Sequence, residues 1–146
     1  MTDIEQSSNY KESVPKLKVI KDPELRERHL GDLQGLSLRE AAKKSRKAHQ
    51  AFVSHSPDQE IPGGGESLDQ LYQRCTSSLE RIGKKHRGER VVVVTHRGVI
   101  RALYKWASLV GRSAGKILST SISKFHFSDG KWTLQSWGDV NHLRTR

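Results

Sequence analysis

Apolar residues follow helical spacing in two central segments of the chain. The first is predicted to be helical over residues 37–52 and opens with the Ser-x-x-Glu pattern of a capping box. The second is predicted over residues 68–87, where Ser67 and Gln70 repeat that pattern and apolar residues recur every three or four positions. Its last turn is basic, as is favourable at a helix C-terminus. We therefore expect two capped helices.

A third pattern predicts a buried strand that leads into another helix. Residues 91–94 are four consecutive valines, which is typical of a strand covered on both faces, as in a parallel sheet. Helical spacing returns over residues 99–107. A shorter strand is expected at residues 17–20, before a proline that disfavours its continuation. The order of these elements is that of an α/β protein.

The end of the chain has the pattern of a β-hairpin. Residues 122–127 and 131–137 alternate around an Asp-Gly pair, which favours a two-residue turn. The predicted fold is an α/β/α three-layer sandwich with a mostly parallel sheet and this C-terminal hairpin. Residues 1–14 are polar without a clear period, so we expect a frayed N-terminus followed by one domain over residues 15–146.

Composition narrows the classes of function. Lysine and arginine exceed aspartate and glutamate by 26 to 16, a net charge of +10 that attracts anions. The basic residues are spread over predicted helix surfaces, so solvated faces are favoured over a nucleic-acid groove. No apolar run has the length of a membrane span, and without a secretory leader a cytoplasmic location is expected. The single cysteine, Cys75, is predicted to pack in the core rather than act as a nucleophile.

Two segments carry candidate chemistry. In the first, His96 leaves the valine strand and enters a helix N-terminus, where free amides and the helix dipole favour a phosphate; the alternative is a histidine that merely ends a strand. Gly98 would let the backbone approach a ligand. In the second, Glu27 lies between arginines in a glycine-containing loop. It is a candidate proton donor beside a bound anion, although solvated loop residues are the commoner case.

Four blocks of sequence follow one another along the chain over about residues 16–143: LRERHLGDLQG, IPGGGESLDQLYQRC, VVVVTHRGVIRALY and WGDVNHL. In this order they resemble the phosphoglycerate mutase-like, or histidine phosphatase, superfamily. They are most similar to plant members of the family, including metal-independent phosphoserine phosphatases. Because all four occur in order, chance similarity is a poor explanation.

This resemblance implies a phosphohistidine mechanism that needs no metal or other cofactor. Glu27 matches the family's general acid, and His96 matches the second active-site histidine, which holds the phosphoryl group. Arg28 follows the glutamate at a position that often contacts substrate, and Gly98 remains a substrate-binding candidate because of its small size. Residues 64–67 match a motif that we interpret as structural. The expected ligand is phosphate or a small phosphorylated metabolite.

The chain also departs from the family pattern. The family's nucleophile lies in an Arg-His-Gly turn, and this triplet does not occur in the sequence. We therefore expect the chain to lack the N-terminal strand, turn and helix, and to be inactive or impaired. Leu30 stands where mutases carry tyrosine, which favours phosphatase over mutase activity. Arg97 replaces a small residue and either crowds the turn or reaches toward phosphate as a substrate-binding residue.

Two further hypotheses remain open beside the phosphatase interpretation. One is a non-catalytic module that binds an anion, forms a homo-oligomer or pairs with a full-length homologue through an exposed sheet edge. The other is a basic nucleic-acid binder, which rests on the net charge alone.

Overall fold

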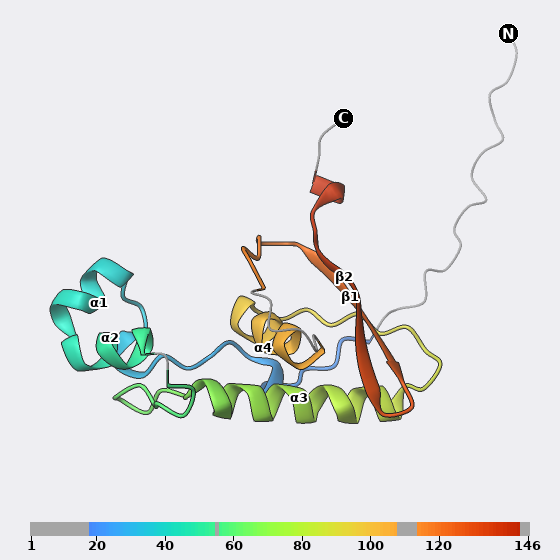
Figure 1. Ribbon diagram of the computed structural model, residues 1–146, viewed down its shortest axis with the longest axis horizontal. Helices are drawn as coiled ribbons and strands as arrows, with labels where there is room; N and C mark the ends of the chain where they lie inside the picture. Colours follow the sequence, from blue (N-terminus) through green and yellow to red (C-terminus); the bar gives the residue numbers. More distant parts are fainter. Residues whose placement is uncertain (1–17, 55, 108–113, 144–146) are drawn as a thin grey trace, which may run out of the picture.

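The computed structural model describes residues 18–54, 56–107 and 114–143. Within them a long helix runs along the molecule, with two short helices near its N-terminal end and a β-hairpin near its C-terminal end (Figure 1). The elements are α1 (Leu38–Lys44), α2 (Arg46–Val53), α3 (Leu68–Lys85), α4 (Arg97–Ala107), β1 (Ile122–Ser128) and β2 (Lys131–Asp139), with 3₁₀ turns at Pro23–Leu25, Gly31–Leu33 and Asn141–Leu143. The predicted frayed segment 1–14 lies outside the described residues.

The caps of α1 and α3 confirm the two capping boxes. The Ser67 hydroxyl accepts a hydrogen bond from the Gln70 amide at 3.1 Å, and the Gln70 side chain accepts one from the Ser67 amide at 2.9 Å. Ser37 and Glu40 make the same reciprocal pair at α1. These bonds satisfy amides that have no partner within a helix. The N-terminus of each helix is therefore fixed by residues that adjoin it in sequence.

The helix predicted over residues 37–52 is interrupted. Ser45 has φ −139° and ψ 70°, outside the helical region, so α1 ends there and α2 begins at the next residue. Serine has a modest helix propensity, and two lysines in the last turn of α1 favour a helix C-terminus at this point. The prediction of one continuous helix was wrong by this break.

The main core lies between α3, α4 and the hairpin. Its buried members are Leu71, Cys75, Leu79, Val99 and Leu103, all at most 6% exposed. Aromatic residues of the hairpin pack against this cluster. Cys75 is fully buried, and this burial raises the pKa of its thiol to about 11. The prediction that this cysteine is a core residue is confirmed.

A second, smaller cluster lies under α1 and α2. Its buried residues are Leu33, Ala41, Ala48 and Ile61. Ile61 also pairs with Gly65 as an isolated β-bridge, which closes the loop before α3. This cluster anchors the loop that follows the candidate acid.

The hairpin is formed as predicted. Strands β1 and β2 pair antiparallel, with Ser128 opposite Lys131. Asp129 has φ 51° and Gly130 has φ 74°, the two positive values that a type I′ turn requires. The sequence therefore predicts this turn because Asp and Gly tolerate that conformation.

The predicted parallel sheet is not formed among the described residues. The sheet there is the two-stranded hairpin, and neither residues 18–20 nor residues 91–94 pair as strands. The four valines are instead 37% to 91% exposed, and Val19 is 84% exposed. A strand needs a neighbour for its backbone hydrogen bonds, and the described segments supply none to these residues. The prediction that these valines form a strand covered on both faces is therefore wrong for the described residues, which contain nothing that covers the valines.

Candidate functional site

The loop over residues 24–35, called the acid loop after the candidate proton donor Glu27, meets the N-terminus of α4 in the structure. One carboxylate oxygen of Glu27, Oε1, accepts a hydrogen bond from the Gly98 amide at 3.1 Å and another from the Arg28 amide at 2.9 Å. The Thr95 hydroxyl donates to the Leu25 carbonyl at 2.6 Å, which ties together the two segments that carry the predicted site residues. Glu27 and Gly98, 71 positions apart in sequence, therefore share one location.

Gly98 allows this close approach because it has no side chain. A Cβ atom at this position would overlap Oε1 of Glu27, while its contact with Leu71 would be ordinary at 3.6 Å. The prediction that Gly98 lets the backbone approach a ligand stays a prediction, because the group that approaches Gly98 in this structure is the Glu27 carboxylate.

His96 immediately precedes α4 and is exposed to solvent. Its carbonyl accepts a hydrogen bond from the Ile100 amide at 3.0 Å, so it stands at the N-cap position of the helix. The amides of the first helical turn and the positive end of the helix dipole lie at this position. Exposed His96, the first-turn amides of α4 and the Glu27 carboxyl thus lie at one end of α4, and among these amides that of Gly98 is bonded to Glu27.

The two arginines predicted to bind substrate occupy different environments. Arg28 donates from Nε to the Glu66 carbonyl at 2.9 Å and stacks 5.9 Å above the Phe52 ring. Burial lowers the pKa of Arg28, and the charge of Glu66 opposes this effect. Arg97 is exposed and is the first residue of α4. Within the described residues, Arg28 is therefore held by Glu66, and Arg97 faces solvent beside His96.

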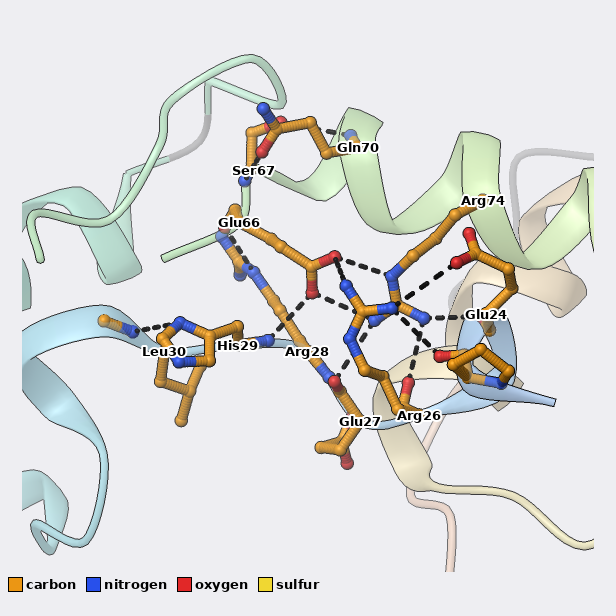
Figure 2. A network of polar contacts seen from close by, with 12 residues as sticks. Glu24, Arg26, Glu27, Arg28, His29, Leu30, Glu66, Ser67, Gln70 and Arg74 are labelled. Atoms are coloured by element: carbon orange, nitrogen blue, oxygen red, sulfur yellow. Dashed lines mark hydrogen bonds and ion pairs between the residues drawn. The ribbon is translucent and has the colours of Figure 1, made fainter. Parts of the chain in front are cut away.

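Arg74, on α3, binds the backbone of the acid loop (Figure 2). Its Nη1 donates to the carbonyls of Glu24 at 2.6 Å and Arg26 at 3.0 Å, and its Nη2 donates to the carbonyl of Glu27 at 3.1 Å. The same guanidinium holds both carboxylate oxygens of Glu66, at 2.6 and 2.9 Å. The backbone on either side of Glu27 is thus attached to α3.

Glu66 makes the complementary contacts to the loop. Its carboxylate accepts from the His29 amide at 2.8 Å, and its own amide donates to the His29 carbonyl at 2.9 Å. Burial raises the pKa of Glu66, but hydrogen bonds from Arg74 and the His29 amide, together with the charges of Arg74 and Arg26, outweigh it and lower the pKa overall. The Glu66 carboxylate is therefore held in its ionised form.

Other features of the described residues do not point to this site. One surface depression lies between the C-terminal end of α3 and the hairpin turn, and another is lined by residues of α2 and the loop after it. Neither includes Glu27 or His96. In the part of the chain that the structure describes, no group of three or more His, Cys, Asp or Glu residues is placed to hold a metal ion, and no helix is long and apolar enough to cross a membrane.

The contacts of Arg74 were not predicted from the sequence, and the motif at residues 64–67 was interpreted as structural. Arg74 lies on α3, whereas Glu66 lies in the loop before the Ser67 N-cap. Their separation of eight positions is no recognised motif.

Comparison with known proteins places the chain in a family. Residues 7–140 match the family model described as histidine phosphatase superfamily (branch 1). Phosphoglycerate mutase-like protein 4 of Arabidopsis thaliana is 60% identical over 88% of this chain and 56% of its own length. The metal-independent phosphoserine phosphatase of the same plant is 54% identical over 86% of this chain and 52% of its own length.

A solved structure supports the same relationship at the level of the backbone. YhfR of Bacillus stearothermophilus superimposes with a TM-score of 0.69 and 27% identity, covering 85% of this chain and 63% of the solved chain. The chain thus spans about half the length of the curated relatives it matches and about two thirds of this structure.

Proposed function

Because the chain belongs to the histidine phosphatase superfamily (branch 1), we propose that its fold serves the hydrolysis of a small phosphomonoester through a phosphohistidine. The observation that carries this proposal is the hydrogen bond from the Gly98 amide to the Glu27 carboxylate, beside exposed His96. This bond supports the proposal because the reaction requires a proton donor close to a group that binds phosphate, and the N-terminus of a helix can bind phosphate.

The chemistry assigned to each residue follows from its position. A phosphoryl group bound at the N-terminus of α4 is stabilised by the helix dipole and by the His96 imidazole. Its negative charge favours the protonated form of the nearby Glu27 carboxyl, which then donates its proton to the leaving alkoxide. Exposed Arg97 extends the positive charge around the ligand. Gly98 provides the space in which the acid and the helix terminus meet.

Phosphoserine is the substrate that we propose. The metal-independent phosphoserine phosphatase of Arabidopsis thaliana, 54% identical to this chain, supports it. Leu30 stands where mutases carry tyrosine, which also favours phosphatase activity over mutase activity. No metal or other cofactor is needed for the residues in these roles.

We further propose that these 146 residues alone form no phosphoenzyme. The sequence contains no Arg-His-Gly triplet, in which the family nucleophile lies. Removing the nucleophile of a serine hydrolase lowers the rate about a millionfold and leaves about 10³ to 10⁴ over water. The chain is then expected to bind phosphate without turning over substrate.

Exposure of residues 91–94 supports a second role, pairing with a full-length homologue. Within the described residues these valines present exposed β-branched side chains and a backbone without a strand partner, which a neighbouring strand would cover. Co-elution of the chain with the full-length Arabidopsis phosphatase in size-exclusion chromatography would support pairing. Independent elution of the two proteins would remove this role without affecting the phosphate site.

Orthophosphate titration of the ¹⁵N-labelled chain tests the main proposal. We expect phosphate to shift the Gly98 amide and His96 ring signals. The H96A variant should bind more weakly, and E27Q should bind more tightly at pH 7, because it removes a negative charge that repels the ligand. H126A is the matched control, since His126 is an exposed histidine on β1. Unshifted Gly98 and His96 signals at saturating phosphate would contradict the proposed function.

A further inference from the structure

Every N–H group of the Arg74 guanidinium donates a hydrogen bond, either to the Glu66 carboxylate or to a backbone carbonyl. Its five N–H donors have one acceptor each: two oxygens of Glu66 and three carbonyls of the acid loop. The Arg74 side chain is only 9% exposed, and that of Glu66 is 12% exposed. This is a built arrangement, because a planar fork with five donors meets five acceptors in a largely buried place.

The acceptors in the loop are backbone atoms that bracket the acid. Arg74 holds the carbonyls of residues 24, 26 and 27, and Glu66 holds the backbone of His29 on the other side. The Glu27 side chain itself is exposed and is held mainly through Oε1. Its direction is therefore set largely by the backbone from which it projects.

We propose that Arg74, oriented by Glu66, is a positioning residue that fixes the Glu27 carboxylate against the Gly98 amide. This inference rests on the proposed function, in which Glu27 is the proton donor. Arg74 lies on the opposite side of the loop backbone from that carboxylate and bonds to the carbonyls, so it acts through Glu27 and not on the substrate (Figure 2). Fixing the loop removes the search for a productive side-chain direction before each proton transfer.

A lysine cannot replace this arginine. The lysine ammonium has three donors at a single point, whereas the observed contacts need five donors spread over a plane. R74K keeps the charge opposite Glu66 but gives up the simultaneous hold on three carbonyls. It therefore separates the electrostatic contribution of Arg74 from its positioning contribution.

The test follows the hydrogen bond between Glu27 and Gly98 in the ligand-free chain. In the wild type, the Gly98 amide shift and the Glu27 ¹³Cδ shift should titrate with one midpoint, because protonation of the carboxyl weakens their bond. In R74K the Glu27 ¹³Cδ should still titrate, and the amplitude at the Gly98 amide should fall by more than half. R81K is the matched control, since Arg81 is on the same helix but bonds Asp22 and Ser78.

An undiminished Gly98 amplitude in folded R74K would overturn the inference and leave Arg74 a purely structural residue. A measurement on the wild type covers the case in which R74K does not fold. The Nη protons of Arg74 should give separate, slowly exchanging signals, in contrast to averaged signals from exposed Arg81; averaged signals from Arg74 would equally overturn the inference. Failure of the proposed function shows differently, as a wild type whose Gly98 and His96 signals ignore orthophosphate.

Discussion

Replacing Gly98 by alanine should separate the stability of α4 from the geometry of the acid. Gly98 lies in the first turn of α4 and has no positive φ, so alanine is compatible with its backbone. Alanine is preferred to glycine inside helices by about 1 kcal/mol. The added Cβ overlaps Oε1 of Glu27, however, and this carboxylate is the flexible end of an exposed side chain. The carboxylate is therefore expected to move away.

The two effects nearly cancel in stability. The variant loses the hydrogen bond between the residue-98 amide and the Glu27 carboxylate. Water can replace this solvent-exposed bond for both groups, so its loss costs only about 1 kcal/mol. The contact of the new methyl group with Leu71, at 3.6 Å, adds no strain. The free energy of unfolding of G98A should thus stay within about 1 kcal/mol of the wild type, which corresponds to roughly 2–4 °C in the melting temperature for a chain of this size.

The position of the acid should nevertheless change. Thermal unfolding followed by circular dichroism measures stability, and the pH titration of the residue-98 amide measures its bond to Glu27. We expect a near-normal melting temperature and an amide that no longer follows the Glu27 carboxyl. A G98A variant destabilised by more than about 2 kcal/mol, or one whose amide still titrates with Glu27, would refute the reasoning.

A second glycine-to-alanine variant provides the matched comparison. Gly83 is also helical, but its Cβ would lie 2.8 Å from the Phe127 ring and 3.0 Å from Trp132, which are packed against each other. Overpacking of this kind costs about 1–3 kcal/mol and is only partly offset by helix propensity. G83A should therefore lower the melting temperature and leave the titration of the Gly98 amide unchanged.

Three further predictions concern single groups. Because the pKa of Glu66 is lower in the folded chain than its ordinary value of 4.5, its contribution to stability is present above that pH and is lost as the pH falls below it; E66Q should show a smaller loss of melting temperature between pH 5 and pH 3. S67A should lower the free energy of unfolding by about 1 kcal/mol in urea titrations, because it removes the cap of α3. Cys75 should react with a thiol reagent at pH 8 only as fast as the chain unfolds, since it is fully buried and its pKa is about 11; rapid native-state labelling would contradict the packing.

The elements that the sequence predicted well are those whose determinants lie close together in the chain. The capping box at Ser67 and Gln70 and the turn at residues 129–130 each depend on residues within four positions of one another. The break at Ser45 was missed because helical spacing continues across it and no glycine or proline marks it. Residues 91–94 were predicted as a strand because valines favour sheets, but strand formation depends on a partner that local sequence does not reveal.

In the candidate site, too, the residues with a local sequence signal were predicted and those that depend on distant contacts were not. His96 was predicted from its place between a valine run and a helix, and Glu27 was predicted mainly from the resemblance to the family. In the structure the Glu27 carboxylate is bonded to the Gly98 amide, two positions after His96. Arg74 could not be found in this way, because its acceptors in the loop are carbonyls 47–50 positions away, and carbonyls have no sequence signature.

Arg74 binds the loop through backbone carbonyls, and this determines which side chains of the loop can change. Because Arg74 holds the carbonyl oxygens of residues 24 and 26, these bonds do not depend on the side chains at the two positions. They do depend on the side chain of Glu66, whose two carboxylate oxygens are bonded to Arg74 and one of which also pairs with Arg26 at 3.3 Å. The loop can therefore present different side chains to a ligand while the direction of the Glu27 carboxylate stays fixed. One short segment can therefore vary the side chains that contact the substrate and still keep the same proton donor in place.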